Sequence, residues 1–214
     1  MNKRLLVLWA GWLLPVAMAV AAPVAEVAGL SGEAHTGPAA QARALAVGDK
    51  LEPGADVRTG DKGRVRLRFV DGSTVVIGDR SVFRIEAFAG GRDGKPRQAS
   101  LLLQLGLIGQ TVSPSRGGSW TVRTPSAVTA VRGTEFMVEV GADLDTSVDV
   151  QEGKVEIETV DAPDKPRAKS LRQPPVLLQP GSPAMVCRQG GECVVAKSFN
   201  PDRMKQKQDR LSGV

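Results

Sequence analysis

The sequence predicts an all-β fold, built as a β-solenoid-like stack of short strands, with a β-sandwich as the second choice. Apolar and polar residues alternate with a period of two in several short runs, which places every second side chain on one face of a strand. Turn-forming Gly, Asp and Pro residues separate these runs at intervals of about eight to twelve positions. The chain of 214 residues holds 24 glycines and 14 prolines, as a protein with many turns requires.

Residues 1–21 are predicted to be a secretory signal peptide. Asn2-Lys3-Arg4 is a basic start, an apolar run extends from Leu5 to about Met18, and Ala19-Val20-Ala21 is a small-residue exit. The apolar run is shorter than the ~20 residues of a spanning helix, so a cleaved signal is favoured over an uncleaved anchor. We therefore expect a periplasmic or secreted protein with no integral membrane segment after cleavage.

The charge of the mature chain is mildly positive. Without Lys3 and Arg4, 26 basic residues face 23 acidic ones, for a net charge of +3. Nucleic-acid binding would call for a clustered basic footprint, which is not found here. We predict no nucleic-acid partner.

Residues 22–44 are predicted to form an N-terminal strand (Val24 to Leu30) and a loose loop that contains the single histidine, His35. A β domain is predicted to follow over residues 45–186. Its expected strands in the first half are Ala55 to Thr59, Arg64 to Val70, Ser73 to Ile77, Ser81 to Phe88 and Leu101 to Leu105. The last run is continuously apolar, which is typical of a strand buried on both faces.

The run from Arg64 to Val70 carries the first candidate interaction site. Val65, Leu67 and Phe69 alternate with three arginines, so the arginines should share the outward face. Together with Arg84, the residues Arg64, Arg66 and Arg68 could hold a carboxylate- or phosphate-bearing partner through bidentate contacts. The alternative is a solvated sheet face that protects the strand from aggregation.

A second candidate motif lies in the run from Val131 to Phe136, where Arg132, Gly133 and Thr134 precede Phe136. A glycine between polar residues at a strand start indicates a positive φ or a close backbone approach. We interpret the motif as structural first, with contact to a partner as the alternative. Further strands are expected at Thr134 to Val140, Val148 to Val150 and Val155 to Ile157.

These runs, in this order, resemble the FecR-type periplasmic domain family. The resemblance is carried by Val122 to Ala127, Val131 to Phe136 and Val148 to Val155, with weaker support from Gly60 to Leu67, Asp71 to Ser73 and Leu105 to Ile108, over roughly residues 45 to 187. It implies a solenoid-like β fold and supplies no catalytic residues. In the regulators that name the family, the domain relays the state of an outer-membrane receptor to a cytoplasmic sigma-factor regulator.

The C-terminal part, residues 187–214, is predicted to be a disulfide hairpin and a helical tail. Cys187 and Cys193 flank Gly190-Gly191, which suits a hairpin with the two sulfurs opposite each other and a disulfide in an oxidising compartment. Before the hairpin, a charged loop (161–175) and a closing strand pair (176–186) are expected. After it, Asn200 as cap and Pro201 at the first position predict a helix to Leu211, and the hairpin or this helix should cover the end of the stack.

No constellation for catalysis stands out, and we predict a non-enzymatic protein with no metal and no cofactor. A Ser-His-Asp triad needs a histidine base, and the single histidine, His35, lies in a Gly/Ala-rich segment with no sign of order. Without a second histidine, a catalytic transition-metal site is not expected either. Asp143, Asp145 and Asp149 could suggest a calcium loop, but turn chemistry is favoured because Asp149 falls on a strand. A hydrolase with unrecognised carboxylates remains a third hypothesis.

The sequence departs from the plan of the full regulators, because a signal peptide stands where a cytoplasmic segment and an internal helix would be. We therefore interpret the chain as a stand-alone exported module that binds an envelope protein, in a signalling-related role. The alternative is a module that binds an anionic envelope polymer such as peptidoglycan through the arginine face.

Overall fold

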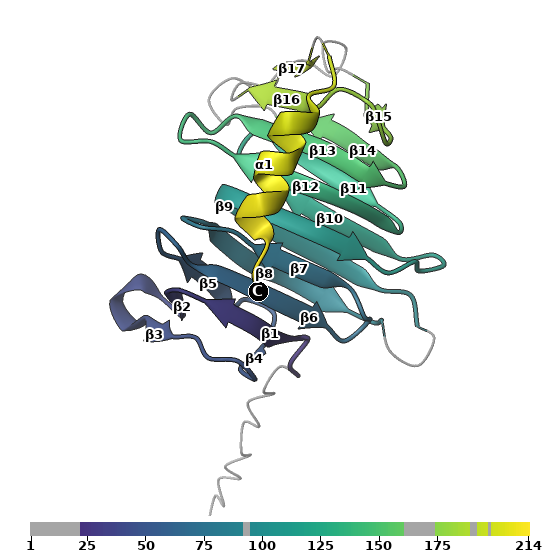
Figure 1. Ribbon diagram of the computed structural model, residues 1–214. Helices are drawn as coiled ribbons and strands as arrows, with labels where there is room; N and C mark the ends of the chain where they lie inside the picture. The colour runs from purple at the N-terminus through teal and green to yellow at the C-terminus, as the bar shows by residue number, and fades with distance from the viewer. Residues whose placement is uncertain (1–21, 92–94, 161–173, 189–191, 197) are drawn as a thin grey trace, which may run out of the picture.

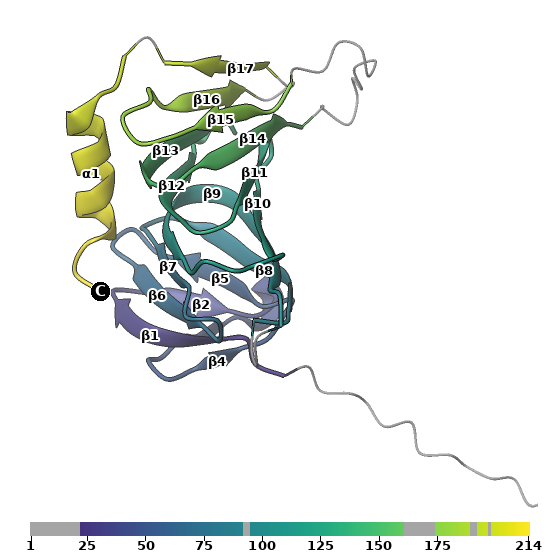
Figure 2. The same ribbon diagram turned by 90° about the vertical axis from the view of Figure 1, so that its right-hand side faces the viewer.

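The computed structural model describes residues 22–91, 95–160, 174–188, 192–196 and 198–214, and the predicted signal peptide lies outside them. Within this part, seventeen strands form one hydrogen-bonded network that is folded into two facing sheets (Figures 1 and 2). The strands are stacked along one axis from the N-terminal to the C-terminal end, as Figure 1 shows. The all-β prediction is confirmed, whereas the solenoid description stays a prediction.

The first sheet consists of nine strands, of which one, β9, is shared with the second sheet. In spatial order they are β4 (Lys50–Leu51), β1 (Ala25–Ser31), β6 (Arg64–Phe69), β7 (Thr74–Ile77), the second half of β9 (Gln98–Val112), β12 (Thr134–Val140), β13 (Thr146–Glu152), β16 (Met185–Arg188) and β17 (Glu192–Val195). All neighbours in this sheet pair antiparallel.

The second sheet also consists of nine strands, with β9 again in the middle. Its strands in spatial order are β3 (Arg43–Ala44), β2 (Ala34–Thr36), β5 (Asp56–Thr59), β8 (Val82–Ala89), the first half of β9, β10 (Ser119–Arg123), β11 (Ala127–Val131), β14 (Val155–Thr159) and β15 (Val176–Leu178). The pairing of β9 with β10 is parallel, and the others are antiparallel. A short 3-10 turn, η1 (Ala39–Gln41), links β2 and β3.

The long strand β9 joins the two sheets at Gly106. Before this residue β9 pairs with β8 and β10, and from it onward β9 pairs with β7 and β12. Gly106 has a φ of +96°, which disfavours any residue with a side chain. A Cβ at this position would collide with Ser81, whose Cα would lie 2.5 Å away. The crossing between sheets therefore depends on a glycine.

One hydrophobic core lies between the sheets and runs from Val24 to Cys193, so the residues on either side of the predicted 45–186 domain share it.

A buried polar cluster interrupts this core. Arg97 Nη1 donates to Asp71 at 2.6 Å and to the Ser113 carbonyl at 2.8 Å, and the guanidinium lies 5.2 Å from the ring centroid of Trp120. Trp120 in turn donates to Gln110 at 2.8 Å. The cluster therefore holds the β6–β7 turn, through Asp71, and the segment after β9, through Ser113, against the core.

The C-terminal elements follow the predicted order. Cys187 and Cys193 lie opposite each other on β16 and β17 and form a disulfide, which confirms that prediction; the residues between them, 189–191, lie outside the described part. The helix α1 (Pro201–Leu211) begins as expected, because the Asn200 side chain accepts a hydrogen bond from the Arg203 amide at 3.0 Å.

The structure corrects several details of the sequence-based picture. Of the two elements expected to cover an end of the stack, α1 instead crosses the outer face of the first sheet, whereas the cysteine hairpin lies at the C-terminal end and supplies β17 (Figure 1). The strand at Leu101 to Leu105 extends to Val112 and is more buried on one face than on the other, since Gln104 is exposed. The expected loop around His35 contains β2, and the two closing strands β15 and β16 belong to different sheets.

Candidate interaction surfaces

Three of the four predicted interaction arginines lie together on the first sheet. The burial pattern of β6 alternates as expected, with Val65, Leu67 and Phe69 in the core and the arginines outward. Arg64 Nε donates to the carbonyl of Arg210 at the end of α1, at 2.5 Å. Arg68 lies 4.0 Å from Glu26, and Arg66 is exposed beside it. We call Arg64, Arg66 and Arg68 the β6 stripe.

Arg84 is not part of this stripe, because it lies on β8 in the second sheet. Its guanidinium forms a two-point ion pair with Asp56, with distances of 2.6 and 3.0 Å, and this hydrogen bonding raises the pKa of Arg84. The pair borders a cleft of about 760 Å³ at the N-terminal end of the stack. The cations that line the cleft are Arg43, Lys50, Arg58 and Arg84.

A third surface lies at the C-terminal end, where both sheets finish in a short strand. Among the described residues, β15 pairs as a strand with β14, and β17 pairs as a strand with β16. Large apolar side chains are exposed on these strands and on the link to α1: Leu177, Val194, Val195 and Phe199. Exposed apolar side chains that lie close together are a feature that protein partners use.

The second predicted motif is mainly structural in its contacts. Gly133 has a φ of +116° and packs against Pro114, where a Cβ would lie 3.2 Å from its Cα. Thr134 donates to the carbonyl of Lys154 at 3.1 Å, and Phe136 is fully buried. Arg132 is exposed and borders a shallow cavity of about 390 Å³ together with Lys154. Only this arginine of the motif is placed to meet a partner.

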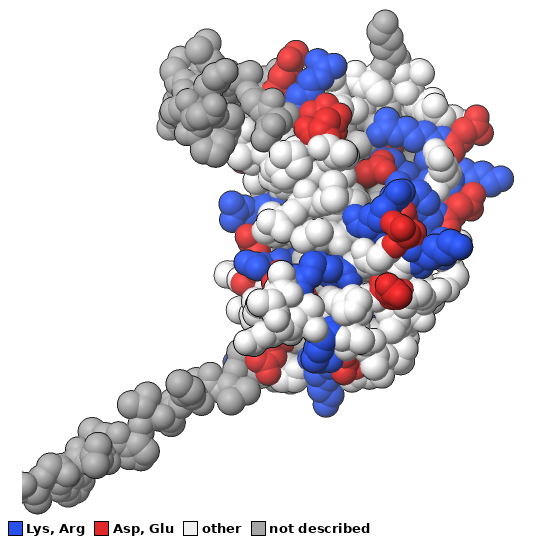
Figure 3. All heavy atoms as spheres, turned by 90° about the vertical axis from the view of Figure 1, so that its left-hand side faces the viewer, with Lys and Arg blue, Asp and Glu red and all other residues white. Residues whose placement is uncertain are grey.

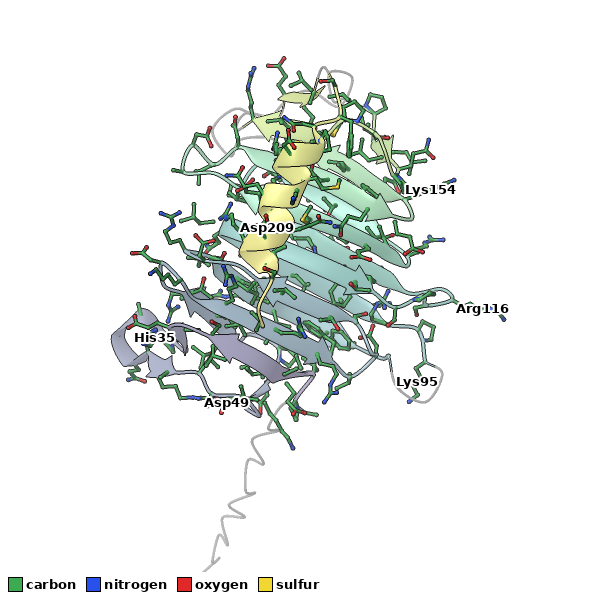
Figure 4. The ribbon with its side chains drawn as sticks, viewed as in Figure 1. His35, Asp49, Lys95, Arg116, Lys154 and Asp209 are labelled. Carbon is green, nitrogen blue, oxygen red and sulfur yellow. A yellow bond between two sulfur atoms is a disulfide. The ribbon has the colours of Figure 1, made fainter. Side chains whose placement is uncertain are left out.

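The residues that were weighed as metal ligands do not come together in the described part of the chain. Within that part, no group of three or more His, Cys, Asp or Glu side chains could hold a metal ion. His35 lies on β2 near the N-terminal end of the stack, far from Lys154 near the other end (Figure 4). Asp149 belongs to an ion pair with Lys207, and its carboxylate accepts at 2.6 Å.

Sequence reasoning missed the charged network between α1 and the first sheet. It involves cations of the helix and carboxylates that are distant in the chain, and Figure 3 shows charged side chains of both signs gathered on the side that carries α1. The only signal in the sequence was the density of basic residues in the predicted helix. Asp79, which lies next to Gly78 in the segment between β7 and β8, accepts from Arg210 at 3.0 Å.

Comparison with known proteins identifies the central part of the chain. Residues 55–156 match the family model described as FecR protein, so the chain contains a FecR domain. This range lies inside the region over which the sequence resembles that family, and the resemblance is confirmed. A search of curated proteins gave no match.

Two solved structures share the fold. Both are crystal structures of a protein assigned as an anti-sigma factor from Parabacteroides distasonis ATCC 8503, at 2.50 and 1.65 Å resolution. The TM-scores are 0.52 and 0.51 at 21% identity, and each match covers 70% of this chain and 62% of the other. The likeness therefore spans less than two thirds of the neighbour and concerns the fold. Within the described residues, no helix has the length and apolarity needed to cross a membrane.

Proposed function

We propose that this protein is a non-enzymatic, exported FecR-domain module that binds a protein partner in the cell envelope, in a signalling-related role. The FecR domain at residues 55–156 is the observation that carries the proposal. The fold shared with a protein assigned as an anti-sigma factor agrees with it. The predicted signal peptide at residues 1–21 supplies the route of export.

The outer face of the first sheet is the surface that we favour for the partner. It presents the exposed side chains of Arg66 and Arg68, and α1 lies across the same face. Arginine is well suited to interfaces because its planar guanidinium forms two parallel hydrogen bonds with a carboxylate. This surface therefore fits a partner that brings acidic side chains to β6.

A recovery experiment from native envelopes tests the proposal. We compare the wild type with Arg66→Ser/Arg68→Ser after crosslinking, and the matched control Arg84→Ser/Arg123→Ser removes two arginines from the second sheet. We expect one protein to be recovered with the wild type and the control but not with the β6 variant. Recovery with the wild type and both variants would place the interface elsewhere, and recovery with none of the three proteins would refute protein binding.

A second candidate function is the binding of an anionic envelope polymer. The observation that favours it is the cleft of about 760 Å³ at the N-terminal end, which four cations line. Co-sedimentation with purified peptidoglycan is the test, because binding through exposed charges weakens as salt is added. Lys50→Ser/Arg84→Ser should abolish such binding, whereas the β6 variant should leave it unchanged.

A further inference from the structure

The inward face of α1 is basic, and α1 contributes nothing to the hydrophobic core. Its inward residues follow helical spacing, whereas Lys205, Gln206, Gln208 and Asp209 are exposed. The inward set is Arg203, Met204, Lys207, Arg210 and Leu211. None of these five belongs to the core cluster between the sheets. The two sheets therefore enclose their core without the helix.

The sheet beneath α1 offers carboxylates at the spacing of these cations. Lys207 Nζ lies 2.6 Å from Asp149 on β13 and 3.1 Å from Glu139 on β12. One helical turn further, Arg210 lies 2.5 Å from Glu139 and 3.0 Å from Asp79, which follows β7. Three acidic side chains from three separate parts of the sheet thus face two cations three residues apart.

The electrostatics of Glu139 show how closely the two surfaces match. Burial opposes ionisation of this carboxylate, but the charge of Lys207 and the hydrogen bonds from Arg210 and Lys207 outweigh it and lower the pKa of Glu139. For Arg210, burial likewise favours the neutral form, and hydrogen bonds to Asp79 and Glu139 outweigh it, so its pKa is raised. Both groups are therefore charged at neutral pH.

The same face also recognises the end of a helix. Arg64 of the β6 stripe donates to the Arg210 carbonyl, one of the last carbonyls of α1, where the helix dipole places partial negative charge. Leu211 sits over Gly109, where a Cβ would lie 2.6 Å from Leu211 Cδ1. A cavity of about 310 Å³ remains between this end of α1 and the sheet. We call the surface formed by Arg64, Asp79, Gly109, Glu139 and Asp149 the helix groove.

From these contacts we propose that the helix groove is a docking site for a basic amphipathic helix of the partner protein, and that α1 occupies it until the partner displaces it. The proposal deepens the proposed function, on which it rests, by stating the chemistry of the partner. The partner helix carries two cations three residues apart and a leucine next to the second, as Lys207, Arg210 and Leu211 do. Because α1 is held by ion pairs, by hydrogen bonds and by the packing of Leu211 on Gly109, a competing helix with the same groups can replace these contacts one for one.

The groove can be tested without knowing the partner by using α1 itself as the probe. A labelled peptide of residues 200–214 is titrated into the full-length variant Lys207→Glu, whose own helix is repelled by Asp149 and Glu139. The matched control is Lys205→Glu, which makes the same charge change on the exposed side of α1. We expect fluorescence anisotropy to show binding to Lys207→Glu at least tenfold tighter than to the wild type or Lys205→Glu, and weaker binding as salt is added.

Two further arms make the result decisive. Adding Asp149→Asn to the Lys207→Glu protein, or changing Lys207 and Arg210 to Ala in the peptide, should abolish the binding. Absence of binding to a Lys207→Glu protein that remains folded by circular dichroism, or binding that survives these changes, would overturn the groove proposal. If Lys207→Glu does not fold, hydrogen exchange of the wild type decides: α1 amides should exchange faster than those of β12 and β13 and accelerate with salt, and equal protection would overturn it.

The outcomes separate this proposal from the one on which it rests. If the peptide fails to bind while envelope crosslinking still recovers a protein through the β6 stripe, the FecR-domain module binds its partner without the groove. If the peptide binds but no envelope protein is recovered, the groove stands as a helix site and the proposed function fails.

Discussion

Asp71→Ala probes the buried polar cluster that ties the loops at one edge of the stack to the core. The carboxylate lies 2.6 Å from Arg97, and the exposed fractions of the two side chains are 5% and 1%. Without it, the guanidinium stays buried with the Ser113 carbonyl, the Ser73 hydroxyl and the face of Trp120 as partners. Removing one partner of a buried pair costs about 3–5 kcal/mol, because the remaining charge is left uncompensated. We expect a loss of that size in the free energy of unfolding.

Urea denaturation with the disulfide intact measures the effect, and a double-mutant cycle isolates the pair. Arg97→Met alone should cost less, about 1–3 kcal/mol, because Asp71 keeps the Ser73 amide and hydroxyl as donors. The double variant should lose less stability than the sum of the two single variants, by about 1 kcal/mol or more. A cost below about 1 kcal/mol for Asp71→Ala, or additive costs, would refute the role assigned to this ion pair.

Three further perturbations have defined outcomes. Gly106→Ala should lower the free energy of unfolding by about 1–3 kcal/mol because of the positive φ, and by more because of the clash with Ser81. Gly48→Ala is the comparison, since Gly48 also has a positive φ but nothing within 4 Å of its Cβ position. A smaller drop in Tm for Gly106→Ala than for Gly48→Ala would contradict this. Replacing both cysteines by Ser should cost about 2 kcal/mol in chemical denaturation, since the closed loop is short. Folding lowers the pKa of Glu139, so the ionised carboxylate adds to the free energy of unfolding. This stabilisation is complete above the ordinary pKa of 4.5 and is lost as the pH falls below that value. The Tm of Glu139→Gln should therefore depend less on pH between about 5 and 3 than the wild-type Tm.

Local pattern predicted most of the strands correctly, and the reason is visible in β6. Because apolar and polar residues alternate along β6, the sequence itself indicates which side chains face the core, and Val65, Leu67 and Phe69 are indeed buried. The same holds for α1, whose start is encoded by the adjacent residues Asn200 and Pro201. In both cases the information lies in neighbouring residues, so the sequence alone is sufficient.

Partners that are distant in the chain could not be predicted in this way. Asp79 and Arg210 are 131 positions apart, and Glu139 and Arg210 are 71 positions apart, so no local pattern connects them. Likewise, nothing in the polar loop before Arg97 indicates that its guanidinium is buried. The shift of β9 between the sheets was also missed, because Gly106 was interpreted as the end of a strand, whereas the strand passes through it with a positive φ.

We propose that the outer face of the first sheet binds a protein in the cell envelope. The most direct measurement is photocrosslinking in living cells, with the crosslinking amino acid at Arg66 on this face or at the exposed Gln104 on the second sheet. We expect a discrete protein adduct from position 66 and none from position 104. No adduct from position 66, or the same adducts from both positions, would contradict it.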